Sequence, residues 1–292
     1  MDETIQPILT EKNSAVVGDL RLHEFDSRIL RNRRMLRVWL PPEYEAERNR
    51  ERYYPVFYLN DGQNLFDTAT AFAGVEWQVD ETADRLIRQE EIPPLIVVGI
   101  DNAQRERIRE YLPYRMVSPP VLRPLGKRYP EFLLNEVMPF LFQRYRIARG
   151  PENTGLGGSS LGAIISLYTA IDRPGIFGRL LLESPSLFVS NRRLLRNSRA
   201  FRLWPEKIFL AMGTNEDGRP DRDREVVEDV EELQHILRRA GLGDDRLRVK
   251  IVEGAKHNEA EWARRFPEAL GFLFGSEVVP KDGTADSSLR SE

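Results

Sequence analysis

The chain of 292 residues contains 43 basic and 46 acidic side chains, and its formal charge of −3 argues against a nucleic-acid-binding protein, which would show a basic excess. With 41% hydrophobic and 30% charged residues, the composition is typical of a soluble globular protein and not of a disordered chain. Because cysteine is absent, a disulfide framework, a thiolate metal site and a cysteine nucleophile are all excluded.

The two ends of the chain predict its location and its domain boundaries. Its first residues lack the basic start and apolar run of a secretory signal, and no stretch approaches the ~18 uninterrupted apolar residues of a membrane span. We therefore expect a cytoplasmic protein with no membrane partner. Residues 1–18 are predicted to be an N-terminal extension, residues 19–275 a single domain, and the polar residues 276–292 a flexible tail.

Strand and helix patterns alternate along the chain. Strands are predicted at 19–25 and 34–40, where alternating polarity favours antiparallel edge strands with one wet face. The elements expected after them are, in chain order, a strand at 55–59, a helix at 78–89, a strand at 94–100, a helix at 131–144, a short strand at 153–156, a helix at 161–171, strands at 179–182 and 207–211, a helix at 222–240, a strand at 247–252 and a helix at 259–274.

The later strands are mostly continuous apolar runs, as in strands buried on both faces. This order predicts an α/β fold with a mostly parallel central sheet, antiparallel N-terminal strands and helices on both faces. The connections at 103–128 and 184–204 are long for such a fold, so we expect them to form walls that face a substrate.

The strongest local motif is Gly158-x-Ser160-x-Gly162, between the short strand at 153–156 and an apolar helix. In that context the pattern predicts a nucleophile elbow, in which a serine lies on a sharp strand-to-helix turn and the glycines remove Cβ atoms that would clash. A plain Gly-Ser turn is the alternative. Ser159 is a poorer nucleophile candidate because Leu161 would then occupy the place of the closing glycine.

A serine nucleophile needs a base, and only three histidines are present. His23 precedes the serine and lies on an edge strand, where a surface position is expected. His235 lies off the apolar stripe of the helix at 222–240, so we expect it to be solvated. His257 follows the last predicted strand, and it alone has the chain order and the location required of the base.

The acid that orients the histidine is expected after the strand at 207–211. Glu216 and Asp217 are adjacent there, and their spacing does not choose between them. The oxyanion formed on attack needs preorganised donors. We expect one to be the backbone N–H of Leu161 and the other that of Gln63, where Gly62 lets the backbone turn inward.

Five segments together resemble the putative esterase family of α/β hydrolases, which includes siderophore esterases, feruloyl and acetyl-xylan esterases, S-formylglutathione hydrolase and mycolyl transferases. The resemblance runs from about residue 20 to 275. The segments are Tyr58 to Asp67, Ile100 to Asn102 with Arg107 to Pro113, Gly158 to Gly162, Gly213 to Glu216, and His257 to Trp262.

The resemblance implies an α/β-hydrolase fold with Ser160 as nucleophile, His257 as base and Glu216 as acid, with Asp217 as second choice. A tryptophan five positions after the histidine, Trp262, is most similar to the siderophore-esterase branch, where some members use a Ser-His dyad. The resemblance also implies that the loop from Arg107 to Pro113 lines the site, where Arg107 or Arg109 would meet an anionic or phenolic substrate; a solvated basic loop is the alternative. Asp61 and Trp262 are the other candidates for substrate binding.

The prediction is a serine carboxylic ester hydrolase that acts on a small or medium ester of siderophore, feruloyl or acetylated-sugar type, through an acyl-enzyme and without a metal or an organic cofactor. Three alternatives share the sequence evidence: an acyltransferase, a thioester hydrolase of the S-formylglutathione type, and a binding module that retains only the fold.

Overall fold

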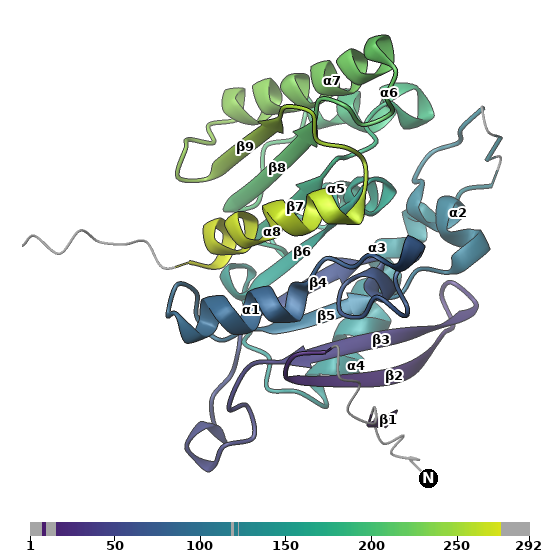
Figure 1. Cartoon of the computed structure of the whole chain (residues 1–292). Coiled ribbons are helices and arrows are strands. Elements are labelled where there is room, and N and C mark those ends of the chain that lie inside the picture. Colours follow the sequence, from purple (N-terminus) through teal and green to yellow (C-terminus); the bar gives the residue numbers. More distant parts are fainter. Residues whose placement is uncertain (1–7, 10–15, 118–119, 122, 276–292) are drawn as a thin grey trace, which may run out of the picture.

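A nine-stranded sheet runs through the part of the chain that the computed structural model describes, residues 8–9, 16–117, 120–121 and 123–275 (Figure 1). The strand order is β1-β2-β3-β5-β4-β6-β7-β8-β9; β1, β2, β3 and β5 pair antiparallel, and all later neighbours pair parallel. The strands are β1 (Ile8–Leu9), β2 (Asp19–Ser27), β3 (Asn32–Leu40), β4 (Val56–Asn60), β5 (Ile96–Ile100), β6 (Thr154–Ser159), β7 (Arg179–Glu183), β8 (Lys207–Gly213) and β9 (Leu247–Val252).

The sheet confirms the predicted mostly parallel α/β architecture with antiparallel N-terminal strands. The sheet also includes part of the predicted N-terminal extension, because Ile8 in β1 pairs with Leu22 in β2. The predicted tail at 276–292 lies outside the described residues.

Four of the five predicted helices form within two residues of their expected bounds. The described helices are α1 (Val79–Arg88), α2 (Arg107–Tyr111), α3 (Tyr129–Phe132), α4 (Met138–Phe142), α5 (Leu161–Asp172), α6 (Val189–Ser198), α7 (Pro220–Arg239) and α8 (Glu259–Phe274). The helix predicted at 131–144 is divided by a π-helical turn at Leu133–Val137. Pro139 lacks the N–H that a regular α-helix would use there, which explains the division.

The two long connections are more regular than the sequence indicates. Helix α2 lies within residues 103–128, and α6 lies within residues 184–204. Among the described residues, no helix is both long enough and apolar enough to cross a bilayer.

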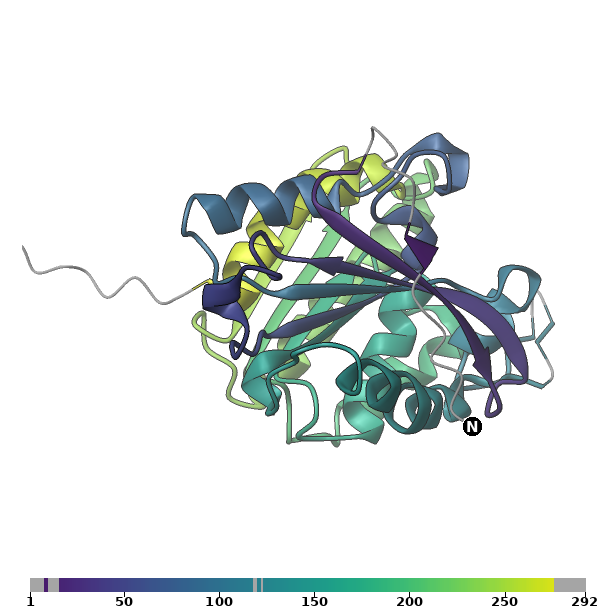
Figure 2. The same ribbon diagram turned by 90° about the horizontal axis from the view of Figure 1, so that it is seen from below.

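Helices cover both faces of the sheet, with α1 and α8 on one face and the others, including α5, on the opposite one (Figure 2). Side chains alternate accordingly along β4. Val56 and Tyr58 pack into the core with α5, whereas Phe57 and Leu59 pack into the core with α1 and α8. Full burial of such a side chain stabilises the fold by about 1.5–3 kcal/mol. Strands buried on both faces have room for polar side chains chiefly at their ends.

The surface position predicted for His23 is wrong. Its side chain in β2 is 2% exposed, with Nε2 2.6 Å from the hydroxyl of Tyr145 and the ring 5.3 Å from that of Phe140. Residues from α4 and the turn after it therefore cover a strand face that the sequence pattern leaves open to water. Burial, with the nearby charges of Arg144 and Arg21, lowers the pKa of His23 to about 4.

The buried histidine predicts a pH-dependent stability. In the unfolded chain His23 takes up a proton near pH 6.5, but in the folded chain only near pH 4. The contribution of the buried, neutral His23 to the free energy of unfolding is complete above pH 6.5. It is lost as the pH falls towards 4, because the unfolded state then binds more protons than the folded state. We expect the free energies of unfolding of wild type and His23→Gln to converge by about 1–2 kcal/mol between pH 7 and pH 4.5, with partial solvent screening allowed for.

Urea unfolding at the two pH values measures this difference. Glutamine keeps a polar group that can bond Tyr145 but does not titrate. A gap between the two proteins that stays the same at both pH values would rule out the proposed linkage.

The candidate site residues lie at one edge of the sheet, where the parallel strands end. Asp61 follows β4, Ser160 follows β6, and Ser184 follows β7. Glu216 and His257 lie on the loops after β8 and β9. Ligands of open α/β sheets bind at this carboxyl edge, so the site is expected there.

Candidate active site

Ser160 lies on a strained turn between β6 and α5. Its backbone has φ 55° and ψ −121°, which is uncommon for a residue with a side chain. The turn is held by a hydrogen bond of 2.9 Å from Ser160 N–H to the carbonyl of Glu183, and the Ser160 carbonyl accepts from Ile164 N–H at 3.2 Å. The surrounding structure thus fixes the serine at the start of a helix.

The glycines of the motif allow the close packing of this turn. A Cβ on Gly158 would lie 3.1 Å from Cβ of Asn60, and a Cβ on Gly162 would lie 3.1 Å from Oδ2 of Asp61. The amide of Asn60 also donates to the carbonyls of Gly157 and Gly162, each at 3.2 Å. The end of β4 is therefore packed against the turn that contains Ser160 and is hydrogen-bonded to it.

His257 lies against Glu216 and shares two cavities with Ser160. Nδ1 of His257 is 2.5 Å from Oε2 of Glu216, which leaves Nε2 as the ring nitrogen that can exchange a proton with another group. In the described residues no hydrogen bond joins Ser160 to His257; the serine hydroxyl lies 3.2 Å from Oγ of Ser186. Catalytic hydrogen bonds are often long before substrate binds.

The side chain of Glu216 is almost covered from solvent and receives several hydrogen bonds. Besides its contact with His257, its Oε1 accepts from the Ser184 hydroxyl and from Gly213 N–H, both at 2.7 Å. Burial by itself raises the pKa of Glu216, but the hydrogen bonds, first that from His257, lower it below its ordinary value. Glu216 is therefore held as a carboxylate.

Asp217 points to a different set of partners. Its carboxylate pairs with Arg219, and its backbone N–H donates to Asp223 at 2.7 Å. Its side chain is 44% exposed, compared with 5% for Glu216. Of the two acids, only Glu216 contacts His257.

Trp262 supports this acid from α8. Its indole Nε1 donates to Oγ of Ser184 at 3.0 Å, and that hydroxyl donates to Glu216. The Trp262 ring also meets the His257 ring at 5.1 Å between centroids in an edge-to-face arrangement. Three residues further along α8, Nε of Arg265 lies 2.9 Å from Oε2 of the fully buried Glu183.

Two cavities meet at Ser160 and His257. The first, of about 520 Å³, is lined mostly by polar residues, together with the aromatic side chains of Phe72 and Trp262. The second, of about 430 Å³, has an apolar part that includes Phe188, Met212 and Val226. The other residues that line the first cavity are Asp61, Gln63, Asn64, Asn102, Gln104, Arg107, Ser159 and Glu259.

The predicted substrate-binding residues are only partly brought together. Asp61, Arg107 and Trp262 line the first cavity, but Arg107 donates to both carboxylate oxygens of Asp61 at 2.7 and 2.8 Å. Arg109 lies away from both cavities, where it contacts Glu106 and the carbonyl of Arg123. His235 is exposed on α7, as predicted.

The two predicted oxyanion donors lie at turns next to the site. Leu161 is the first residue of α5, and the first N–H groups of a helix have no partner within it. Gln63 lies in a short 3₁₀ turn, Gly62–Asn64, and lines the first cavity. A Cβ on Gly62 would lie 2.5 Å from the carbonyl carbon of Gly99, so only glycine allows this turn to approach β5 so closely.

Several further residues at the site are not among those that the motifs predict. Ser184 and Ser186, which contact Glu216 and Ser160, directly follow strand β7. Asn102 follows β5 and donates to Asp61 at 2.7 Å. Their place after parallel strands is a signal that could have found them. Glu259 in the first turn of α8 had no comparable signal.

The chain has relatives of several kinds. It is 25% identical over 256 residues to the uncharacterized protein YbbA of Bacillus subtilis, covering 84% of this chain and 93% of that protein. The enterobactin esterase FES of Shigella flexneri is 18% identical with a TM-score of 0.69; the match covers 91% of this chain but 62% of that longer protein. The siderophore hydrolase EstB of Aspergillus nidulans is 19% identical with a TM-score of 0.66, covering 92% and 99% of the two chains.

These structural likenesses confirm the α/β-hydrolase fold that the resemblance implies. A family model described as "Putative esterase" matches residues 27–273, which is most of the sequence. The chain therefore belongs to the putative esterase family of α/β hydrolases and is a carboxylesterase-type hydrolase.

Proposed function

We propose that the chain hydrolyses carboxylic esters through an acyl-enzyme, with Ser160 as nucleophile, His257 as base and Glu216 as acid. The observation that carries this proposal is the contact of 2.5 Å between His257 Nδ1 and Glu216, next to cavities that His257 shares with Ser160. The strained backbone of Ser160 supports the assignment of its turn as a nucleophile elbow.

In the proposed reaction, Oγ of Ser160 attacks the ester carbonyl while its proton moves to Nε2 of His257. The backbone N–H groups of Leu161 and Gln63 donate to the resulting oxyanion, each contributing about 3 kcal/mol to transition-state stabilisation. His257 then gives the proton to the departing alcohol, and the acyl group stays on Ser160. Water, deprotonated by His257, releases the acid and restores the serine hydroxyl.

Glu216 would fix the tautomer of His257 and stabilise the imidazolium. A carboxylate that accepts from Nδ1–H leaves Nε2 free to receive the serine proton. The hydrogen bonds from Ser184 and Gly213 keep Glu216 ionised and oriented while His257 becomes positive. Trp262 acts through Ser184 in this proposal, as a positioning residue.

The cavities support an ester with a polar part and a smaller apolar part. In the first cavity the charge of Arg107 is already matched by Asp61, so recognition there would rely on hydrogen bonds rather than on a free cation. The amide group of Gln104 lines this wall, whereas that of Asn102 already donates to Asp61 and accepts from Gln104 N–H. A siderophore, feruloyl or acetylated-sugar ester has hydroxyl groups suited to such an amide, and the enterobactin esterase and siderophore hydrolase relatives favour the first of these.

Labelling with a fluorophosphonate probe tests the proposed nucleophile. The probe phosphonylates a serine only when a base activates it, so we expect one adduct per chain, on the peptide that contains Ser160. Heat-denatured protein is the control and should stay unlabelled. An adduct on Ser159 or Ser186, or no adduct on the native protein, would contradict the assignment.

A further inference from the structure

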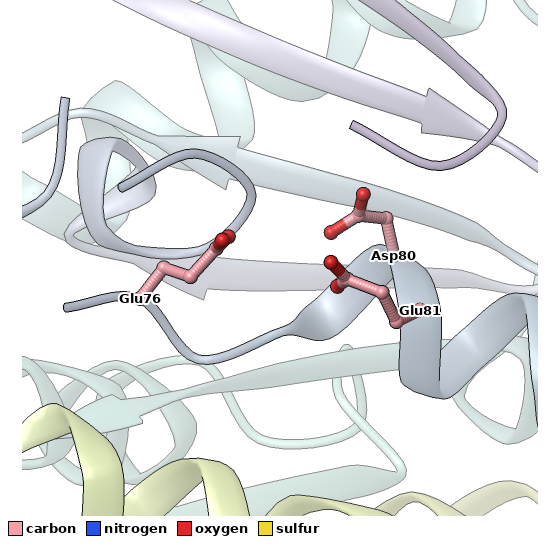
Figure 3. Close-up of side chains that lie close together, drawn as sticks. All are labelled: Glu76, Asp80 and Glu81. Atoms are coloured by element: carbon pink, nitrogen blue, oxygen red, sulfur yellow. The ribbon is translucent and has the colours of Figure 1, made fainter. Parts of the chain in front are cut away.

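Three carboxylates gather at the beginning of α1, away from the Ser160 site. Glu76 comes from the segment before the helix, and Asp80 and Glu81 come from its first turn (Figure 3). One oxygen from each lies within 4.8 Å of the others. In Figure 3 the three carboxylates point toward one another across a small space.

Two of these side chains, Glu76 and Asp80, are buried without the partners that burial requires, and Glu81 is partly buried. Asp80 is fully buried and Glu76 is 8% exposed. One oxygen of each of the three side chains is buried and has no hydrogen-bond partner in the described part of the chain: Oε2 of Glu76, Oδ1 of Asp80 and Oε2 of Glu81. The other oxygen of Asp80 accepts from Val17 N–H at 2.7 Å.

Arg85 and Arg264 line the same cavity as Glu76 and Glu81, but Arg85 donates to Gln89 and Arg264 pairs with Glu261. Among the ion pairs of the described residues, none includes any of the three carboxylates. Buried like charges without compensation are costly, and the cluster must take up positive charge in some form. Burial, followed by the charges of Glu81 and Asp67, raises the pKa of Glu76 to about 7. Burial, with Glu81 next to it, raises the pKa of Asp80 to about 8. Protons or a bound cation would both satisfy this cluster.

We propose that Glu76, Asp80 and Glu81 bind a divalent cation of the calcium class. The three unpartnered atoms are all carboxylate oxygens, which are the ligands that Ca²⁺ prefers. Two oxygens on opposite sides of a calcium ion are about 4.8 Å apart, since each calcium–oxygen distance is about 2.4 Å, so the spacing suits one shared ion. Water and backbone carbonyls would complete its coordination.

The cation would brace one wall of the Ser160 cavity. It would join α1 to the segment before it, and Trp77, between Glu76 and α1, packs its ring 5.7 Å from that of Trp262. Trp77 N–H donates to the carbonyl of Asn64, a cavity residue, at 2.9 Å. The ion would not touch the reacting atoms, so its role is structural, and the ester chemistry still needs no metal.

Terbium luminescence tests the site directly. Tb³⁺ occupies calcium sites, and a neighbouring tryptophan sensitises its emission. The full chain treated with EDTA and then given TbCl₃ should show sensitised emission that CaCl₂ removes. Glu76→Gln and Asp80→Asn should each reduce the emission at least about tenfold at subsaturating Tb³⁺. Asp84→Asn, one turn further along α1 and paired with Arg88, is the matched control and should keep it.

Thermal unfolding supplies an independent readout. At a CaCl₂ concentration about 100 times the Kd, we expect the Tm to rise by about 5–10 °C over that in EDTA, and Asp84→Asn to show the same rise. In Glu76→Gln the rise should vanish, and NaCl of equal ionic strength should not produce it.

If neither Tb³⁺ nor Ca²⁺ has an effect on the wild type, the proposal is overturned and the three carboxylates hold protons instead. Emission that survives in both Glu76→Gln and Asp80→Asn would overturn it as well, because the ion would then lie elsewhere. Should Asp80→Asn fail to fold, Glu76→Gln and the wild-type measurements still decide.

Discussion

Ser160→Ala is expected to lower the rate of hydrolysis of a short-chain aryl ester by about 10⁴-fold or more. Without the hydroxyl no acyl-enzyme can form, and His257 and Glu216 have no nucleophile to activate. The surrounding turn should persist, because it is held by backbone hydrogen bonds and by the amide of Asn60. Initial rates with 4-nitrophenyl acetate measure the effect, and circular dichroism checks that the variant is folded.

Ser159→Ala is the matched control for the register of the motif. Ser159 is the last residue of β6, and its neighbour Ser160 occupies the strained turn. The control should keep most of the wild-type rate and lose only what a small change in packing costs. Equal rates for wild type and Ser160→Ala would refute the proposed nucleophile, and loss of activity in Ser159→Ala alone would move it by one residue.

The parallel part of the sheet could be predicted because its strands carry their own signal. The residues of β4 and β5 are buried on both faces, so each sequence run is continuously apolar. Gly241, which follows α7 with a φ of 90°, adds a local stop signal that depends on backbone geometry alone. Such features are local, and a single sequence contains them.

What the sequence could not reveal depends on contacts between distant segments. His23 is buried by Tyr145, which is 122 positions away, so the pattern of β2 alone gives no sign of this cover. Helix α6 contains residues with positive φ, including Ser190 and Asn191, which are not typical of a regular helix. Its apolar positions are few, so its sequence lacks a clear helical period. Both features arise from tertiary packing.

The candidate site also contains residues that the sequence predicts and residues that it does not. Chain order and strand ends predict Ser160 and His257, since each follows a recognisable strand. The choice between Glu216 and Asp217 depends on the direction of two adjacent side chains, which spacing cannot give. In the structure Glu216 contacts His257, whereas Asp217 pairs with Arg219. The position of Ser184 after β7 is a signal in the sequence, but its hydrogen bonds to Glu216 and Trp262 are encoded by no motif.

Glu216→Gln is expected to lower kcat by about 10²- to 10⁴-fold, because the amide would favour the wrong tautomer of His257. Two donors, the Ser184 hydroxyl and Gly213 N–H, meet at the position of Oε1. They would hold the amide oxygen there and place the NH₂ group against His257 Nδ1. That nitrogen would then have to accept, so the ring proton would lie on Nε2, which could not take the proton of Ser160.

Asp217→Asn tests whether the neighbouring acid shares this role. Its carboxylate pairs with Arg219 at the surface, where solvent screens the ion pair, so we expect stability and kcat close to those of the wild type. The reverse ranking of the two variants would assign the acid to Asp217. A loss of less than about tenfold in Glu216→Gln, with Ser160→Ala and His257→Ala both inactive, would instead indicate a Ser-His dyad in which Glu216 only orients the loop that carries it.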